Sequence, residues 1–204
     1  MKHFIPYCLF LVLFPYSLFA KKVATISIDG SINPVSADFI HSSISKAKSD
    51  GAECLIIYLN TPGGLLTSTR QIVSDILNSP VPVVVYVAPA GAHAGSAGVF
   101  ITLAAHVAVM APGTNIGAAH PVLIQSQMDS TMNEKATNDA AAFIRTISEK
   151  RNRNMLWAER AVRKSESYTE TEALKDSVID FIAKNELELL AQLEEKKIET
   201  STGI

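Results

Sequence analysis

The sequence contains few of the residues that cross-link a chain or bind a metal ion. Its 204 residues include two cysteines, Cys8 and Cys54, which are too few for a disulfide framework. No cysteine pair and no His-x-x-x-His motif has the spacing of metal ligands, and the acidic residues are scattered. The Gly-x-x-x-x-Gly-Lys loop of nucleotide-binding proteins is also missing. We therefore expect neither a metal site nor a bound cofactor.

An excess of charge of one sign is missing as well. The formal net charge is −2, with 19% charged and 48% hydrophobic residues. This balance gives no general attraction to nucleic acid, and the hydrophobic fraction is ample for a packed core. The length predicts one folded domain, with a small appendage at most.

The first twenty residues contain no acidic residue and hold six of the chain's aromatic residues. They begin with Lys2, continue with a short apolar run and end at Ala20, just before Lys21 and Lys22. This pattern is typical of a secretory signal peptide. An uncleaved N-terminal membrane anchor is the alternative, although a spanning helix needs about 20 apolar residues. Residues 1–20 therefore predict export, to the periplasm or the extracytoplasmic face of the membrane.

The rest of the chain has the pattern of an α/β domain. Short β-branched runs alternate with longer helical patterns, and continuous apolar runs of this length suit strands covered on both faces. The predicted strands are 23–28, 55–59, 83–87 and 106–110, and the predicted helices between them are 34–48, with Asn33 as N-cap and Pro34 first, and 65–77. This alternation predicts a parallel sheet with right-handed crossovers.

The character of the sequence changes after Pro112. The elements expected there are a mobile polar loop over 122–133, helices over 134–151 and 155–163, a short helix started by a capping box at 169–172, a late strand over 178–183 and a helix over 185–196. The main domain is therefore expected to span residues 21–196, with a frayed tail over 197–204.

A basic run covers residues 150–153, and Arg160, Arg163 and Lys164 follow it. Such runs are typical of a solvated helical face, because charged side chains are seldom buried without a partner. Contact with lipid headgroups is the alternative for this run.

Two glycine-rich segments directly follow predicted strands. In the first, Asn60–Leu65, Gly63 and Gly64 let the backbone turn and approach a ligand, and amides at the next helix start can hold an anion. The second contains Ser96 among small residues. A nucleophilic serine needs open approach and backbone donors, which a helix starting beside Ser96 would supply. The alternatives are an ordinary turn and a small-residue helix, and Ala94 breaks the Gly-x-Ser-x-Gly pattern.

A nucleophilic serine also needs a base. Lys135 lies in the first turn of the helix expected from Glu134, where the helix dipole and burial would both favour a neutral amine. Glu134 itself would favour the charged form. His93 and His120 are further candidates in the glycine-rich region. The alternative for each is an ordinary solvated lysine or an ordinary surface or buried histidine.

Five motifs in order resemble the protease domain of the NfeD family, which comprises membrane-bound serine proteases of the ClpP class. They are Asn60-Thr-Pro-Gly-Gly64, Tyr86-Val-Ala-Pro89, Ala94-Gly-Ser-Ala-Gly98, Met110-Ala-Pro-Gly-Thr-Asn-Ile-Gly-Ala-Ala-His-Pro121 and Asn133-Glu-Lys-Ala-Thr-Asn-Asp-Ala140. The similarity covers roughly residues 22–195, and Glu149–Asn154 and Thr171–Leu174 extend it.

The resemblance implies an α/β fold of the ClpP/crotonase type, a spiral of β-β-α units. It also implies a serine endopeptidase with a Ser/Lys dyad, in which Ser96 matches the nucleophile and Lys135 the base. His120 lies near the place of the catalytic histidine in soluble ClpP enzymes, so it stays open as a rival base.

The same resemblance assigns an oxyanion hole and a class of substrate. Gly63 or Gly64 and the amide of Ala97 match the positions that hold the oxyanion. Similar family members are implied to cleave hydrophobic segments of stomatin-like membrane proteins. We expect a peptide or protein substrate of that kind, no nucleic acid partner, and a homodimer or higher oligomer.

The sequence departs from the family in one respect. Full-length members continue into several membrane helices and often a small β-barrel domain, and neither follows here. We expect a short form, a split gene product or a truncated reading frame. This departure keeps two other functions open. One is a catalytically silent scaffold that docks a membrane partner, and the other is an acyl-CoA enzyme on the crotonase fold, which needs no nucleophilic serine.

Overall fold

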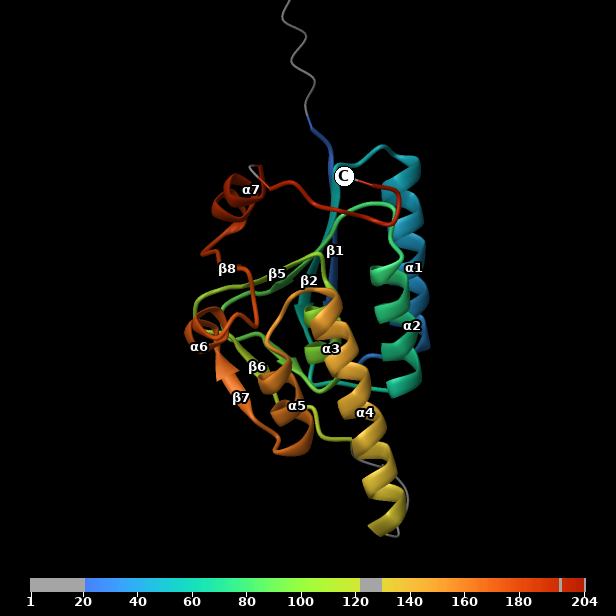
Figure 1. The fold of residues 1–204 in the computed structure, drawn as a ribbon. Helices are drawn as coiled ribbons and strands as arrows, with labels where there is room; N and C mark the ends of the chain where they lie inside the picture. The colour runs from blue at the N-terminus through green and yellow to red at the C-terminus, as the bar shows by residue number, and fades with distance from the viewer. Residues whose placement is uncertain (1–20, 122–129, 195, 204) are drawn as a thin grey trace, which may run out of the picture.

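The computed structural model describes residues 21–121, 130–194 and 196–203 (Figure 1). The signal-peptide prediction for residues 1–20 and the loop prediction for residues 122–129 lie outside these ranges. Within them, no helix combines the length and the apolar character that crossing a membrane requires.

A five-stranded parallel sheet forms the centre of the domain. Its strands in spatial order are β1 (Val23–Asp29), β2 (Cys54–Asn60), β3 (Val83–Val87), β5 (Val107–Met110) and β8 (Phe181–Ile182). The first four were predicted, and their ends differ from the prediction by one residue at most. Helices α1 (Pro34–Ser49) and α2 (Leu66–Leu77) make the first two crossovers. The predicted α/β class with a parallel sheet is confirmed.

The two faces of this sheet pack against different elements, because successive strand residues point in opposite directions. On β2, Leu55, Ile57 and Leu59 belong to a core shared with six helices, whereas Cys54 and Ile56 face the other side. The six helices are α1, α2, α3 (Ala97–Ala104), α4 (Ser130–Lys150), α5 (Met155–Arg163) and α6 (Glu170–Lys175). On the opposite face lies α7 (Glu186–Glu194) (Figure 1).

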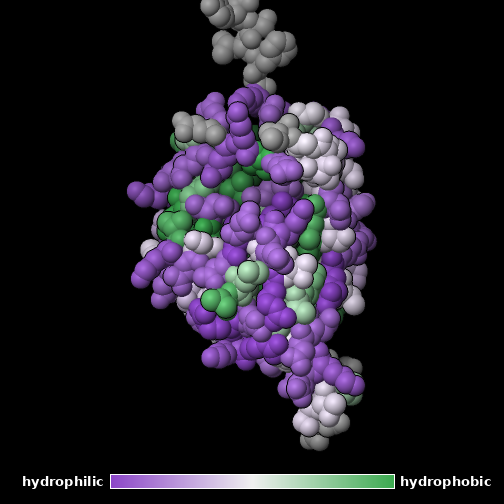
Figure 2. Space-filling view, viewed as in Figure 1, coloured by the Kyte–Doolittle hydropathy of each residue, from purple (hydrophilic) through white to green (hydrophobic). Residues whose placement is uncertain are grey.

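The face under α7 is covered less completely. A cavity of about 780 Å³ remains between α7, the sheet and residues 196–203, and apolar atoms are visible in the recess beside α7 (Figure 2). Cys54 lines this cavity, and burial raises the pKa of its thiol to about 11, so the thiol stays protonated at neutral pH. Across the cavity mouth, Thr202 Oγ1 donates to the carbonyl of Pro80 at 3.2 Å.

Local signals determine where α1 begins. The Asn33 side chain accepts a hydrogen bond from the Ser36 amide at 3.0 Å, and Pro34 occupies the first helical position. Both features were predicted. The capping box at Thr169 likewise starts α6 (Glu170–Lys175) as predicted.

Two predicted boundaries are wrong. Helix α4 begins at Ser130, so the expected loop does not extend over residues 130–133. Adding a turn to a helix that is already nucleated costs little, even with residues of modest helix propensity. The late strand is reduced to β8, because the amides of Val178 and Ile179 both donate to the carbonyl of Ala173 and close the end of α6.

A second, three-stranded sheet was not predicted. It consists of β4 (His93–Gly95), β6 (Asn115–Gly117) and β7 (Ser167–Thr169), with β4 parallel and β7 antiparallel to β6. It joins the main sheet where β2 ends, because Thr61 pairs with Ala94. This sheet therefore brings the two glycine-rich segments side by side.

Candidate active site

Ser96 lies at the junction of β4 and α3, in a strand–turn–helix arrangement. Its backbone has φ 46° and ψ −105°, a conformation that L residues rarely adopt. The strain is held in place because the Ser96 amide donates to the carbonyl of Ala118 at 2.9 Å and its carbonyl accepts from Val99 at 3.1 Å. The Ser96 side chain makes no capping hydrogen bond to α3. Backbone strain at a residue whose side chain does not cap its helix is typical of functional positions.

Gly63 lies directly against Ser96. The turn that carries it is held by Thr61, whose amide donates to the carbonyl of His93 at 2.8 Å and whose carbonyl accepts from Gly95 at 2.9 Å. A Cβ at Gly63 would lie 2.6 Å from the Cβ of Ser96 and 3.1 Å from its Oγ, and Gly63 has φ 122°. Only glycine fits there. The two glycine-rich segments therefore converge on the serine hydroxyl.

The backbone donors around Ser96 differ in their availability. The Gly63 amide donates to Thr61 Oγ1 at 3.1 Å. Gly64 pairs with Ile32 through the flanking peptide groups, so its own N–H points away from Ile32. Among the described residues, neither the Gly64 amide nor the Ala97 amide donates a hydrogen bond. Ala97 is also the first residue of α3, where the helix dipole favours negative charge.

Lys135 lies near the start of α4 and is exposed. Helices α3 and α4 run in the same direction, because Phe100 stacks on Phe143 with ring centroids 5.6 Å apart and Arg151, just after α4, donates to Ala104 at the end of α3. Lys135 precedes Phe143 by about two turns of α4, and Ser96 precedes Phe100 by about one turn, so both lie on the N-terminal side of this contact. Among the described residues, no hydrogen bond joins the two. The structure thus brings Lys135 to the same end of the domain as Ser96.

The part of α4 just after Lys135 is anchored from two sides. Asp139 accepts from Arg70 of α2 at 2.6 Å, and Asn138 accepts from Arg163 of α5 at 2.7 Å. These contacts hold α4 about one turn after Lys135. They therefore fix the position of the helix backbone that carries the lysine.

The two histidines near Ser96 have different surroundings. His120 is half-buried, and its Nδ1 lies 2.9 Å from the carbonyl of Val162. A carbonyl only accepts, so Nδ1 carries the proton and Nε2 is the free acceptor of the neutral ring. The His93 ring lies over Gly95, where an added Cβ would be 2.9 Å from its Nδ1. Among the described residues, neither histidine forms a hydrogen bond with Ser96.

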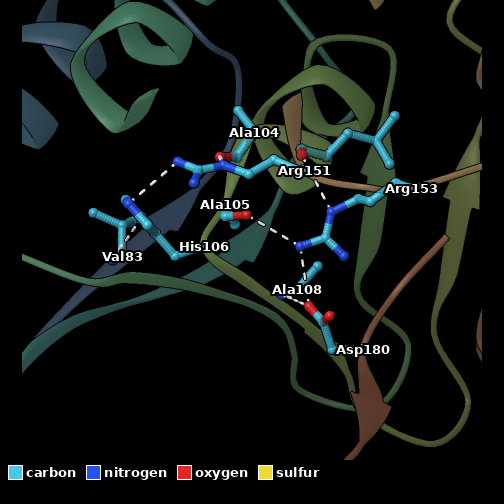
Figure 3. Close-up of polar contacts among 9 residues, drawn as sticks. Val83, Ala104, Ala105, His106, Ala108, Arg151, Arg153 and Asp180 are labelled. Carbon is cyan, nitrogen blue, oxygen red and sulfur yellow. Dashed lines mark hydrogen bonds and ion pairs between the residues drawn. The ribbon is translucent and has the colours of Figure 1, made fainter. Parts of the chain in front are cut away.

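The far end of α3 is held by two arginines of the basic run (Figure 3). Arg151 Nε donates to the carbonyl of Ala104 at 2.8 Å, and Arg153 donates to the carbonyls of Leu103 and Ala105 at 3.2 and 3.1 Å. Arg153 is only 7% exposed and forms an ion pair with Asp180 at 3.0 Å. The predicted solvated face is therefore wrong for Arg151 and Arg153, because the unpaired carbonyls at the end of a buried helix need donors.

His106 belongs to the same cluster, and its ring lies between two donors. The Val83 amide is 3.2 Å from Nδ1, and Arg151 Nη2 is 3.3 Å from Nε2. A proton added to the ring would meet one of these donors. Burial, together with the charges of Arg151 and Arg153, lowers the pKa of His106 to about 4, so the ring is neutral at neutral pH.

Sequence reasoning missed most of this supporting framework. It did not identify Thr61, which aligns the two segments, or Asn60, whose side chain accepts from the His93 amide at 3.0 Å and donates to Asp29 at 2.9 Å. The signal in the sequence that could have identified them is the polar pair Asn60-Thr61 directly after the predicted buried strand 55–59. Among the described residues, no group of His, Cys, Asp and Glu side chains has the arrangement of a metal site.

Comparison with known proteins agrees with this architecture. The family profile described as NfeD1b, N-terminal domain, matches residues 22–197. The membrane-bound protease PH1510 of Pyrococcus horikoshii is 40% identical over 176 residues, which are 85% of this chain and 40% of that protein. The chain thus spans less than half the length of this relative.

Two solved structures of the 1510-N membrane-bound stomatin-specific protease are also similar. One is a lysine-to-alanine mutant in complex with a substrate peptide, with a TM-score of 0.83 and 37% identity, covering 91% of this chain and 85% of the other. The other is a serine-to-alanine mutant, with a TM-score of 0.83 and 38% identity, covering 90% of each chain. The expected ClpP-like fold is confirmed by these matches, and this chain belongs to the NfeD1b family, of which it contains the N-terminal domain.

Proposed function

We propose that this chain is a serine endopeptidase of the ClpP class. The observation that carries the proposal is the convergence of Gly63, the strained Ser96 and the free amide of Ala97 at the start of α3. A nucleophile that its own helix does not use, beside unengaged backbone donors, is the arrangement that acyl transfer requires. The similarity to the 1510-N protease supports the same reaction.

In the proposed mechanism, Lys135 in its neutral form takes the proton of the Ser96 hydroxyl. Ser96 Oγ attacks the scissile carbonyl, and the tetrahedral oxyanion is held by backbone amides. The protonated base then gives its proton to the leaving amine as the C–N bond breaks, which leaves an acyl-enzyme. Water, deprotonated by the same base, attacks this ester and releases the second product and the free serine.

The free amides favour Gly64 and Ala97 as the oxyanion donors among the three predicted residues. The Gly63 amide is already engaged by Thr61 Oγ1. Gly63 acts instead by leaving the space in which Ser96 Oγ and the substrate carbonyl meet. The N-terminal end of α3 adds its dipole to the stabilisation of the oxyanion.

Lys135 is the proposed base because the anchored part of α4 directs it to the end of the domain that carries Ser96. A lysine has a long flexible stem and acts as a base once it is desolvated, which a bound substrate can bring about. His120 is the rival base, with Nε2 as the proton acceptor.

The proposed substrates are hydrophobic segments of stomatin-like membrane proteins. The name of the 1510-N structures, a stomatin-specific protease, supports this class, as does the substrate peptide bound in one of them. An N-terminal segment that directs export would place the domain on the extracytoplasmic side of the membrane. We propose that the chain acts there as a homodimer or higher oligomer.

The test is cleavage of a hydrophobic peptide by the purified chain. Ser96→Ala is expected to lower the rate at least about 10³-fold, because removing a nucleophile leaves only binding and oxyanion stabilisation. The exposed Ser42 of α1 provides the matched control, and Ser42→Ala is expected to leave the rate unchanged. If Ser96→Ala cleaves as fast as the wild type, Ser96 is not the nucleophile.

A second pair of variants separates the bases. Lys135→Ala is expected to lower the rate as strongly as Ser96→Ala, whereas His120→Ala keeps most of the activity. The reverse order would assign the base to His120. The exposed Lys175, on α6, gives the matched control for loss of a lysine.

A further inference from the structure

A polar pocket lies at the end of the domain opposite Ser96. It has a volume of about 440 Å³ and is formed where α4 ends, beside the start of β5 and the segment 196–201. Four cationic side chains line it: Lys150, Arg151, Lys196 and Lys197. They come from two parts of the chain that are distant in sequence, so the fold itself gathers them around one space.

Arg151 is the innermost of these cations, and its charge is not neutralised. Its hydrogen bonds go to neutral acceptors, the carbonyl of Ala104 at 2.8 Å and the carbonyl of Ile76 at 3.5 Å, and its Nη2 lies 3.3 Å from the neutral ring of His106. Among the described residues, Arg151 has no carboxylate partner. Burial, together with the charge of Arg153, lowers the pKa of Arg151 to about 10, as expected for a poorly solvated guanidinium.

The acidic residues of the pocket do not compensate for this charge. Asp180 is already used, because its Oδ2 accepts from Arg153 at 3.0 Å and from the Ala108 amide at 2.7 Å. Glu199 is exposed in the C-terminal segment. Among the described residues, Lys150 and Lys197 form no ion pair, so their charges stay available at the rim of the pocket.

We propose that this pocket binds a phosphate-bearing anion. A planar guanidinium at the floor and ammonium groups around the rim are the combination that proteins use for phosphate, which presents three or four oxygens in different directions. A carboxylate presents two oxygens in one plane and would leave most of these donors unused. The pocket is larger than a phosphate ion, so an ester group attached to the phosphate has room.

Two sources supply this chemistry, a soluble phosphate or phosphate ester and the headgroup of an anionic phospholipid. The segment 196–201, which lines the pocket, lies at the end of the domain that also carries the start of β1 (Figure 1). A phosphate bound there would contact Arg151, which itself donates to the carbonyl of Ala104 at the C-terminal end of α3.

The first experiment measures binding of inorganic phosphate to the full chain by calorimetry at constant ionic strength, and the rise in Tm with phosphate concentration. The pocket variant replaces Lys150 and Lys197 by alanine. The control variant replaces Lys175 and Lys184, two exposed lysines outside the pocket, and carries the same change in net charge. The pocket variant is expected to bind phosphate about tenfold more weakly, because each exposed lysine charge raises the phosphate affinity about threefold. The control variant is expected to bind phosphate as the wild type does.

Arg151→Met is expected to abolish phosphate binding. Since Arg151 also holds the end of α3, its loss could unfold the chain, and the lysine variants then decide the question alone. Absence of saturable phosphate and vesicle binding in the wild type would overturn the proposal. So would an equal loss of binding in the pocket and control variants.

The second experiment separates the two sources by sedimentation with vesicles of phosphatidylglycerol or of phosphatidylcholine. If the ligand is a headgroup, the wild type and the control sediment with phosphatidylglycerol, and the pocket variant sediments less. If it is a soluble phosphate, the three proteins sediment equally while calorimetry still distinguishes the pocket variant. Peptide cleavage is expected to be the same in all three proteins, so failure here leaves the proposed peptidase function intact.

Discussion

The two ends of α3 differ in whether their backbone polar groups have hydrogen-bond partners. At its C-terminal end, Arg151 and Arg153 donate to the carbonyls of Leu103, Ala104 and Ala105 (Figure 3). At its N-terminal end, the Ala97 amide has no acceptor among the described residues, and Ser96 is strained. Every helix has unpaired groups at both ends, and a buried helix normally satisfies them. Here the end that supports the fold is satisfied and the end that we assign to chemistry is left open.

The strongest test of this contrast is Gly63→Ala at the open end. The added Cβ would lie 2.6 Å from the Cβ of Ser96, and alanine is disfavoured at φ 122°. Displacement of the serine by a few tenths of an ångström or more is expected to lower peptide cleavage by about 10²-fold. The rate is measured under single-turnover conditions.

Gly91 provides the control for Gly63. It also has positive φ, at 87°, but nothing lies within 4 Å of an added Cβ. Gly91→Ala is expected to lower stability slightly and leave cleavage within about twofold of the wild type. Equal losses of activity in the two variants would show that the contact with Ser96 is not what matters.

Arg153→Leu tests the satisfied end. Two helix carbonyls and the carboxylate of Asp180 would lose a buried donor. A buried carbonyl left without its donor costs about 1–3 kcal/mol, and the partly exposed ion pair adds less, so the free energy of unfolding is expected to fall by about 3 kcal/mol. Urea denaturation measures it. Arg145, which pairs with Glu159 near the surface, is the matched control, and Arg145→Leu is expected to cost less than about 1 kcal/mol.

The pH dependence of stability gives a third, smaller test at the same end. The pKa of His106 is about 4 in the folded chain and near 6.5 when unfolded, so the unfolded state binds more protons between these values. The part of the stability that depends on neutral His106 is therefore fully present above about pH 6.5 and is lost as the pH falls toward 4. In His106→Asn, the amide oxygen can accept from Val83 without titrating, and the fall in Tm between pH 7 and pH 4.5 is expected to be smaller. An equal fall in both proteins would assign it to other groups.

The contrast between the two ends also explains what the sequence could predict. Some features depend only on a few neighbouring residues and can be predicted from them. These are Ser96 at a helix start, the turn at Gly63 and the cap at Asn33. The main strands were predicted for the same reason, since Val83–Val87 is buried on both faces and apolar throughout. For these features, sequence and structure agree to within a residue or two.

The arginine cluster could not be predicted in this way. A run such as Lys150–Arg153 is indistinguishable from a solvated face until the end of α3, some fifty residues earlier, is known to lie beneath it. Strands of three residues, such as β4, are too short to show an alternating pattern. The relation of Lys135 to Ser96 stays a prediction, because it depends on the approach of two helices rather than on either sequence alone.

The smallest expected effect concerns the strain at Ser96 itself. With φ 46° and ψ −105°, any residue with a Cβ stores strain there, and glycine does not. Ser96→Gly and Ser96→Ala both remove the hydroxyl, so both are expected to be inactive. Their stabilities should differ, with the glycine variant more stable by about 1 kcal/mol, because relief of strain exceeds the entropy that glycine gains in the unfolded chain. Denaturation of the two inactive variants measures the difference. A more stable alanine variant would mean that this end of α3 is relaxed, and that the contrast with the arginine-held end lies in hydrogen bonding alone.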